Sequence, residues 1–351
     1  MANERILVTG ASGYLGSHIV QALVNSGYNV RATARPAKVA DLQAAYDTTY
    51  NTNGSNKAQV VATSDLVHGV FPEIFEGIDA LIHVASPLPG KEEPEALIDV
   101  AVEATQNILR QAEKAGITRI VVTSSIASVW KASPDPLALV LDTGSSWTDW
   151  NPTTKEVALK TGNPLVIYAA SKTYAERAVW EFADAHPHVD ITTLNPPFFY
   201  GPFAPTQSFP TFDASALSTA GMLYRLLSPD GVYPPNAEHI DVRDVAKAHV
   251  LALKSPPTSV VGRKRIIIAS PHGLNFATLT DFLAEKRPAL KDRLTKETPP
   301  KTDRYNVPLD FARVEQVLGL KKSDFYDFED TILDTIDQLL ELEAGWKSAM
   351  L

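Results

Sequence analysis

The stretch that decides the fold is RILVTGASGYLGSHIV, residues 5–20. It opens with an apolar run typical of a buried strand, residues 5–9, and continues from Gly16 with the apolar spacing of an amphipathic helix. Gly10, Gly13 and Gly16 fall at the junction between the two. Glycine permits a tight turn and lets the backbone approach a pyrophosphate, whose charge the helix N-terminus stabilises. The stretch therefore predicts a dinucleotide-binding unit.

The spacing of these glycines, Gly-x-x-Gly-x-x-Gly, is one residue wider than the usual dinucleotide fingerprint. A purely structural glycine turn is the alternative interpretation. The strand before the glycines and the helix after them are the context that dinucleotide binding requires, and they favour that role.

The first half of the chain repeats the alternation of short apolar runs and longer amphipathic segments, which is typical of βαβ units. We expect strands at residues 5–9, 29–34, 59–63, 80–85, 119–123 and 191–194, and helices at residues 16–26 and 94–115. Later patterns predict helices at 241–253, 276–285 and 327–343 and a strand at 265–269. The predicted fold class is α/β, a Rossmann-type doubly wound parallel sheet with a smaller, partly helical C-terminal substrate domain.

A change in composition marks the expected domain boundary. After Pro196 the chain becomes rich in proline and aromatic residues, which interrupt regular structure. We expect a dinucleotide-binding domain over residues 1–196, with residues 240–255 packing back on it. Residues 197–239 and 256–351 are expected to form the substrate-binding domain.

Composition limits the possible partners. The 351 residues are 44% hydrophobic and 21% charged, and their net charge of -9 argues against nucleic acid or an acidic membrane surface. No cysteine is present, which excludes disulfides, zinc thiolate sites and cysteine nucleophiles. The chain opens without a signal-peptide pattern, and no apolar run approaches the ~18 residues of a membrane span. We expect a cytoplasmic monomer or homodimer that acts on a small molecule.

Two cations after the second strand indicate which cofactor is bound. No acid occurs between Tyr28 and Ala40, where an NAD-binding protein commonly carries one, whereas Arg35 and Lys38 follow the strand. Cations at this place suit the 2′-phosphate of NADPH/NADP+. The alternative is that both are solvated surface charges.

Two further pairs of residues are expected along the cofactor. Asp65 and Leu66 follow the third strand, and Ala85 and Ser86 follow the fourth, so all four fall at the carboxyl edge of the sheet. Asp65 could instead cap the next helix.

Three side chains suit carbonyl reduction. Ser125 follows the fifth strand, and Tyr168 and Lys172 lie on adjacent turns of the next helix. Tyrosine can supply the proton that the developing alkoxide needs, since a neighbouring ammonium lowers its pKa from ~10. Lys172 can also donate to the cofactor ribose, and Ser125 to the substrate oxygen. Tyr168 and Lys172 could be an ordinary surface pair, but of the eleven tyrosines only Tyr168 has a lysine four residues on.

The histidines offer little support for a rival chemistry. His83 falls inside an apolar strand, and His186 and His188 flank a proline, with no spacing that suits a metal. We expect no metal site. The Gly-x-Ser-x-Gly elbow of a hydrolase is also missing.

Four motifs together resemble the extended short-chain dehydrogenase/reductases: TGASGYLGSH at 9–18, VVTSSIASV at 121–129, YAASK at 168–172 and HIDVRDVAKAHVLAL at 239–253. The chain is most similar to the dihydroflavonol and cinnamoyl-CoA reductase branch, especially its microbial aldehyde and methylglyoxal reductases. The resemblance implies an NADPH-dependent reductase of ketones and aldehydes with Ser125, Tyr168 and Lys172 as its triad. A stretch associated with cinnamoyl-CoA reductases, Asn-Trp-Tyr-Cys-Tyr, is absent, which argues against a CoA thioester substrate.

The resemblance also assigns the binding residues. The pyrophosphate would contact the loop residues Gly10, Ser12, Gly13, Tyr14, Leu15 and Gly16. Arg35 and Lys38 would bind the 2′-phosphate, and Asp65 and Leu66 the adenine. Pro196, Phe198 and Phe199 would face the nicotinamide amide. The substrate would contact Leu88, Ser125, Ile126 and Phe198.

Two other functions stay open on the sequence alone. A nucleotide-sugar epimerase or dehydratase would share the fold, although the missing acid after the second strand argues against it. A non-catalytic NADP(H)-sensing module would need the glycine loop but not the three catalytic candidates.

Overall fold

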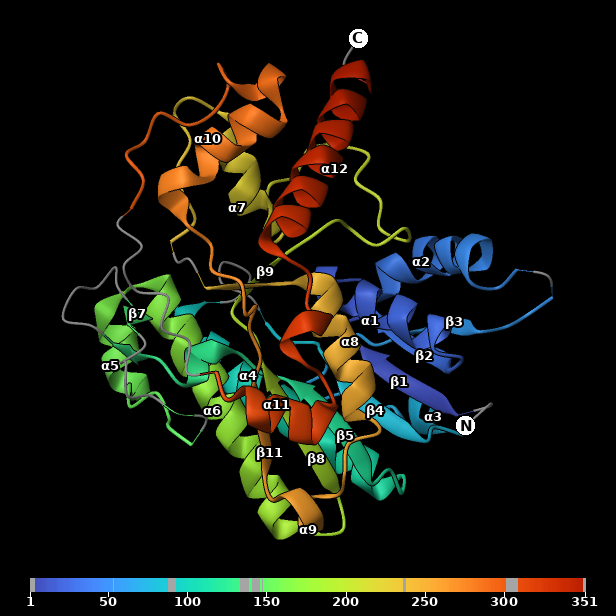
Figure 1. The fold of residues 1–351 in the computed structure, drawn as a ribbon. Helices are drawn as coiled ribbons and strands as arrows, with labels where there is room; N and C mark the ends of the chain where they lie inside the picture. The colour runs from blue at the N-terminus through green and yellow to red at the C-terminus, as the bar shows by residue number, and fades with distance from the viewer. Residues whose placement is uncertain are drawn as a thin grey trace.

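The computed structural model describes residues 4–52, 54–87, 93–132, 139–140, 146, 148–235, 238–300 and 309–349. At its centre lies a seven-stranded parallel sheet with the strand order β11-β8-β5-β4-β1-β2-β3 (Figure 1). The strands are β1 (Arg5–Thr9), β2 (Asn29–Ala34), β3 (Ala58–Ala62), β4 (Ala80–His83), β5 (Arg119–Thr123), β8 (Asp190–Asn195) and β11 (Lys264–Ile267).

The order of the strands reverses between β1 and β4. From β1 the chain builds outward to β2 and β3, and it then returns to place β4, β5, β8 and β11 on the other side. In open α/β sheets of this kind, ligands bind outside the carboxyl ends of the strands at such a reversal. The predicted Rossmann-type fold class is confirmed, and the fold itself indicates where a ligand belongs.

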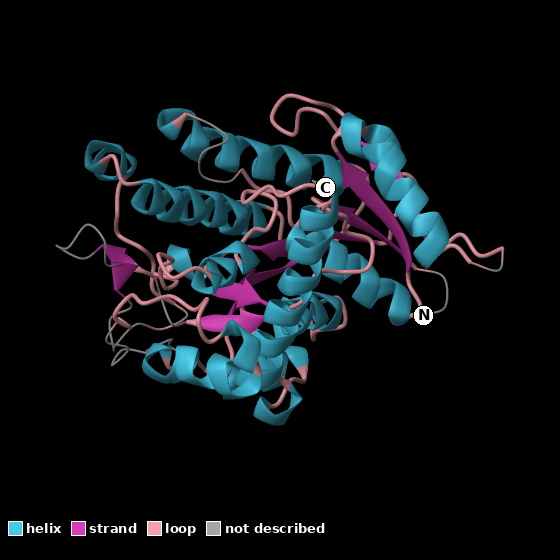
Figure 2. Ribbon diagram, turned by 90° about the horizontal axis from the view of Figure 1, so that it is seen from above, coloured by secondary structure: helices cyan, strands magenta, loops and turns pink. Residues whose placement is uncertain are grey.

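Helices cover both faces of the sheet (Figure 2). The longer ones are α1 (Tyr14–Asn25), α2 (Pro36–Thr49), α4 (Pro94–Lys114), α6 (Pro164–Ala185), α8 (Val242–Ala252), α10 (Phe276–Lys286), α11 (Phe311–Leu318) and α12 (Phe328–Ala349). The shorter ones are α3 (Pro72–Phe75), α5 (Lys155–Thr161), α7 (Ala220–Tyr224) and α9 (Thr258–Val261). Single 3-10 turns occur at η1 (Ile126–Ser128), η2 (Arg225–Leu227), η3 (Pro288–Leu290) and η4 (Lys322–Asp324).

The alternation of side chains along β1 explains the two-sided core. Ile6 and Val8 point to one face, where they join residues of α1 and α8, and Leu7 points to the other face and joins residues of α4 and α6. Successive strand residues face opposite sides of a sheet, so a strand covered on both sides is apolar throughout. On these two faces α1 packs against α8, and α4 against α6.

Beyond β8 the chain forms a second, more helical region. Helices α7, α10 and α12 gather at one end of the molecule, above the sheet (Figure 1). Between them and the sheet lies a parallel pair of short strands, β9 (Phe198–Tyr200) and β10 (His239–Asp241), which the sequence patterns do not predict. A second pair, which is antiparallel, consists of β6 (Lys131–Ala132) and β7 (Leu139–Val140).

One part of the expected domain division is wrong. Residues 256–351 were assigned to the substrate-binding domain, but β11 pairs with β8 and forms the edge of the main sheet. Lys264 also contacts the first residue of β8, with Nζ 2.7 Å from Asp190 Oδ2. The apolar pattern of a strand indicates its burial and not its partner, so the sequence could not place β11. Helix α8 packs on α1, and the assignment of residues 240–255 to the dinucleotide-binding domain stays a prediction.

Among the helices that the structure describes, none is both long and apolar enough to cross a membrane.

Candidate active site

The glycine loop leaves no room for side chains. Gly10 has a φ of +70°, and a Cβ at this position would lie 2.8 Å from the backbone nitrogen of Ala85. A Cβ on Gly16 would lie 2.2 Å from the carbonyl oxygen of Gly10, because the first turn of α1 packs directly on the loop. The loop and the start of the helix thus form a tight backbone cradle, which fits a pyrophosphate.

The other residues of the loop differ in how they face the solvent. Ser12 is exposed, whereas Leu15 is buried. Tyr14 is also buried, and its hydroxyl donates a hydrogen bond to the carbonyl oxygen of Gly201. Its side chain is therefore committed to the protein interior, so any contact of Tyr14 with a phosphate must come from its backbone.

Arg35 and Lys38 stand at the start of α2, immediately after β2. Arg35 is the residue before the helix, and the backbone N–H of Lys38 donates to its carbonyl oxygen at 2.8 Å. Both side chains are exposed, and within the described part of the chain neither forms an ion pair. The two cations are therefore available to a ligand at the carboxyl end of β2.

Asp65 caps a turn. Its Oδ1 accepts hydrogen bonds from the backbone N–H groups of Val67 at 2.9 Å and His68 at 3.1 Å, and these bonds, with those from the His68 side chain, lower the pKa of the carboxyl. The capping role considered for Asp65 is thus present, on a turn and not a helix. Leu66 is partly buried, and its carbonyl oxygen accepts a hydrogen bond from Asn107. Leu88, expected at the substrate, lies outside the described residues.

The structure brings Ser125, Tyr168 and Lys172 together at the carboxyl end of β5. Tyr168 is half-buried; burial raises the pKa of its phenol above the usual value, and a hydrogen bond with Ser125 offsets only part of this rise. Lys172 lies with Nζ 5.6 Å from the centre of the Tyr168 ring and 2.8 Å from Oγ of Ser86. The ammonium is nearly enclosed, and this burial lowers the pKa of Lys172 to about 8, against the opposing charge of Glu176.

Local sequence fixes these positions. Helix α6 begins at Pro164 after Asn163, whose side-chain oxygen accepts the backbone N–H of Leu165 at 2.9 Å. Tyr168 and Lys172 follow at an interval of four residues, which places them on the same face of the helix. Ser125 is the residue before η1, and its Oγ accepts the N–H of Ala127 at 3.2 Å.

The segment after β8 closes the site on its other side. The carbonyl oxygen of Pro196 accepts the backbone N–H of Ile126 at 3.0 Å, which joins this segment directly to the residue after Ser125. Phe198 and Phe199 follow in β9 and are half-buried. Ile126, expected at the substrate, is 1% exposed, so its side chain belongs to the packed core next to the site.

His83, at the end of β4, has a structural role. Its Nδ1 lies 2.7 Å from Oγ1 of Thr9, and that oxygen also accepts the N–H groups of Val84 and Ala85. Burial lowers the pKa of His83 to about 4, so the ring is neutral. In the described ranges no group of three or more His, Asp or Glu residues could hold a metal ion.

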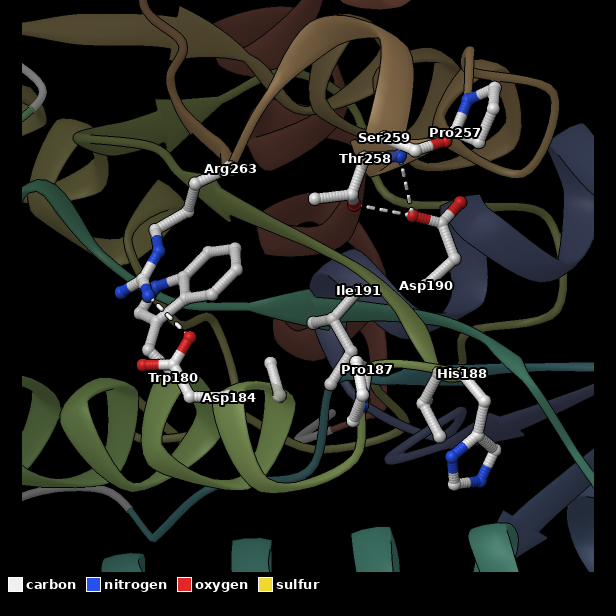
Figure 3. A pocket seen from close by; sticks show the side chains of 12 residues that line it. Trp180, Asp184, Pro187, His188, Asp190, Ile191, Pro257, Thr258, Ser259 and Arg263 are labelled. Carbon is white, nitrogen blue, oxygen red and sulfur yellow. Dashed lines mark hydrogen bonds and ion pairs between the residues drawn. The ribbon is translucent and has the colours of Figure 1, made fainter.

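One hollow lies away from these residues (Figure 3). It measures about 540 Å³ and opens between the end of α6, the start of β8 and α9, at the edge of the sheet opposite to the triad. Two of its acids have partners in the hollow, which Figure 3 marks by dashed lines: Asp184 forms an ion pair with Arg263 and Asp190 accepts a hydrogen bond from the hydroxyl of Thr258. The distances are 2.5 Å and 2.6 Å. None of the candidate residues lines it.

Sequence reasoning missed one residue of the site. Glu176 lies one helical turn beyond Lys172 and is buried, with Arg265 of β11 as its ion-pair partner at 2.7 Å. The only signal in the sequence is an acid that continues the spacing of Tyr168 and Lys172. Nothing in the sequence shows that this acid is buried.

Comparison with known proteins assigns the family. Residues 6–268, from β1 to the end of β11, match the sequence model described as the NAD dependent epimerase/dehydratase family. The chain belongs to this family. The predicted membership of the extended short-chain dehydrogenase/reductases is thereby confirmed.

Relatives cover the chain almost completely. An uncharacterized oxidoreductase of Schizosaccharomyces pombe is 32% identical, over 99% of this chain and 100% of the relative. The NADPH-dependent methylglyoxal reductase of Saccharomyces cerevisiae is 29% identical, over 96% of this chain and 98% of the relative. A crystal structure of the yeast methylglyoxal/isovaleraldehyde reductase with NADPH superposes with a TM-score of 0.79 at 28% identity, covering 97% of this chain and 99% of that one.

Proposed function

We propose that this chain is an NADPH-dependent carbonyl reductase that converts aldehydes and ketones into alcohols. The proposal rests on one observation: Ser125, Tyr168 and Lys172 lie together. They lie near the point where the strand order reverses, between β1 and β4, and next to the tight glycine loop after β1. The relatives named as NADPH-dependent reductases and the yeast reductase structure that holds NADPH support the same activity and cofactor.

Tyr168, Ser125 and Lys172 have different roles in the proposed reduction. When bound, NADPH supplies a hydride to the carbonyl carbon. Tyr168 donates its phenolic proton to the developing alkoxide, and Ser125 donates a hydrogen bond to the same oxygen. Lys172 stabilises the phenolate that Tyr168 becomes, since an adjacent positive charge favours the ionised form.

The proposal is tested by the consumption of NADPH and of NADH with aliphatic and aromatic aldehydes, ketones and keto esters. We expect oxidation of NADPH with at least one of these classes, and much slower oxidation of NADH. Purification with tightly bound NAD, together with no turnover of any carbonyl, would favour an epimerase or dehydratase instead. Binding of NADPH without turnover of any carbonyl would favour a sensing module.

Cofactor selection should depend on Arg35 and Lys38. We expect the double substitution Arg35→Ala/Lys38→Ala to raise KM for NADPH by about 10- to 100-fold, because charge-assisted hydrogen bonds to a phosphate are lost. KM for NADH, which has no 2′-phosphate, should stay unchanged. Lys114→Ala, an exposed cation at the far end of α4, is the control and should change neither constant. Equal losses for both cofactors would contradict the assignment.

The dependence of kcat/KM on pH should report the ionisation of Lys172. Its pKa of about 8 lies below the ordinary value, so the ammonium is present below that pH and is lost as the pH rises through it. We expect kcat/KM for NADPH, which reports groups of the free enzyme, to fall above about pH 8. The Arg35→Ala/Lys38→Ala variant should keep the same midpoint. A profile that stays level to about pH 10, the range of an unperturbed lysine, would contradict this role for the ammonium.

Several expectations remain proposals. We assign residues 197–239 and the helices α10 and α12 to substrate binding, because β9 leads from the triad directly into this region. A cytoplasmic location and a monomeric or homodimeric state also stay predictions, and light scattering on the purified protein decides between monomer and dimer.

A further inference from the structure

The carboxylate of Glu176 is the most heavily hydrogen-bonded group near the site. Its side chain has no exposed surface, and it lies on α6 one turn beyond Lys172. Oε2 accepts hydrogen bonds from Ser124 Oγ at 2.8 Å, Ser128 Oγ at 2.5 Å, Asn195 Nδ2 at 2.7 Å and Arg265 Nη2 at 3.3 Å. Oε1 accepts from Arg265 Nε at 2.7 Å, Thr193 Oγ1 at 3.1 Å and Trp180 Nε1 at 3.3 Å. A carboxylate has about four lone-pair directions, so this one is saturated.

Arg265 donates to both oxygens, and the other donors differ between them. The donors on Oε1 come from β8, β11 and α6 itself, which are parts of the framework. Two of the donors on Oε2, Ser124 and Ser128, belong to the segment 124–128 that follows β5. Oε2 therefore ties this segment to the helix that carries Tyr168 and Lys172.

This segment contains Ser125. Ser124 precedes it directly, and the hydroxyl of Ser128 lies 2.9 Å from the carbonyl oxygen of Ser125. The amide of Asn195 reaches both Glu176 Oε2 at 2.7 Å and the Ser125 carbonyl oxygen at 3.3 Å. The single hydroxyl proton of Ser128 goes to Oε2, so Asn195, with its two amide hydrogens, is the donor that the Ser125 carbonyl oxygen shares with Glu176.

Glu176 is ionised in this arrangement. Burial alone raises the pKa of a carboxyl, but the charge and hydrogen bonds of Arg265, with those of Ser128 and Ser124, outweigh it and leave the pKa of Glu176 below its usual value. An ionised carboxylate accepts on both oxygens, whereas a glutamine amide at the same place presents hydrogens to donors. The hydrogen bonds that Ser124 and Ser128 donate to Oε2 therefore require the ionised carboxylate of Glu176.

We propose that Glu176 is a positioning residue of the reductase: its carboxylate holds the segment 124–128 against α6, so that the side chains of Ser125 and Tyr168 meet. The proposal rests on the proposed function for its kinetic consequence. Its structural content, the restraint of the segment 124–128 by Oε2, does not depend on which reaction is catalysed.

The kinetic test is a double-mutant cycle between Glu176→Gln and Ser125→Ala at saturating NADPH. We expect Glu176→Gln to lower kcat by about 10- to 100-fold, as a misplaced catalytic group does, and to leave the affinity for NADPH unchanged. In the Ser125→Ala background, Glu176→Gln should lower kcat by a clearly smaller factor, because the part of its effect that passes through Ser125 is gone and only the effect of its charge on Lys172 remains. Losses that multiply in the double variant would overturn the proposal.

A milder pair of variants covers the case in which Glu176→Gln does not fold, since it leaves Arg265 buried without its partner charge. Ser124→Ala removes a donor from Oε2, and Thr193→Val removes one from Oε1 with almost no change of shape. We expect Ser124→Ala to lower kcat by about 3- to 10-fold and Thr193→Val to leave it unchanged, although both lose a buried hydrogen bond. Equal kcat in the two variants would overturn the proposal.

Amide hydrogen exchange supplies a readout that does not need activity. Exchange at residues 124–128 should accelerate in Ser124→Ala and not in Thr193→Val. If the parent enzyme turned over no carbonyl but this difference appeared, the proposed function would fail while the restraint by Glu176 would stand. If carbonyl turnover were normal and the two variants exchanged alike, the proposal for Glu176 would fail alone.

Discussion

Replacing Tyr168 with phenylalanine should lower kcat for carbonyl reduction by about 10³-fold, the scale of a lost general acid. The substitution removes only the hydroxyl that is hydrogen-bonded to Ser125, and the ring stays in place beside Lys172. Binding of NADPH, measured by quenching of protein fluorescence, should change little, because the glycine cradle is untouched.

Tyr174 provides the matched control for this experiment. It lies on the same helix, and its hydroxyl accepts the backbone N–H of Lys155 at the start of α5, away from the triad. Tyr174→Phe should keep turnover near that of the parent enzyme and cost a small amount of stability. Near-normal turnover of Tyr168→Phe would refute the assignment of the proton donor.

Gly10→Ala should weaken NADPH binding by about 100-fold or more, through the loss of the charge-assisted hydrogen bonds that the loop backbone offers a pyrophosphate. Two effects combine at this residue. The φ of +70° costs a side-chain-bearing residue ~1–2 kcal/mol, and the new Cβ would lie within 2.9 Å of both N and Cα of Ala85. Ala85 follows the central strand β4, and its backbone atoms cannot move aside as the end of a flexible side chain can. The glycine loop must therefore shift instead. Titration of the apoprotein with NADPH measures the effect.

Gly27→Ala separates the clash from the backbone strain. Gly27 follows α1 with a φ of +89°, but a Cβ there would meet nothing within 4 Å. This variant should show a lowered Tm and an unchanged affinity for NADPH. If both variants weakened binding alike, strain at any point along this unit would be the cause, and the close approach of Gly10 to Ala85 would have no special role.

The sequence predicted the parts of the site that local patterns determine. The glycines between a strand and a helix, the bounds of β1, β2 and β5, and the shared helical face of Tyr168 and Lys172 follow from spacing within short segments. Their convergence also follows, because parallel strands of a doubly wound sheet present their carboxyl ends at one edge. What the sequence could not supply was the set of contacts made between distant segments.

Three features depend on such contacts. β9 and β10 are three residues each and pair across the proline-rich region, so no periodic pattern reveals them. The burial of Ile126 in the core depends on its packing with α4 and α6. The importance of Glu176 becomes visible only when Ser124, Asn195 and Arg265 meet around it.

The edge position of β11 has a consequence for how the molecule is made. As the chain leaves the ribosome, β8 is synthesised long before β11. Arg265, the ion-pair partner of Glu176, is synthesised 89 residues after it. In that interval the nascent chain carries an unpaired strand edge at β8 and an acid without its cation, and the open edge favours misassembly. Completion of the sheet is therefore a late, long-range step, and slow folding follows from the loop closure that it requires. A fragment that ends near residue 196 would carry every candidate catalytic side chain and still be unable to finish its fold.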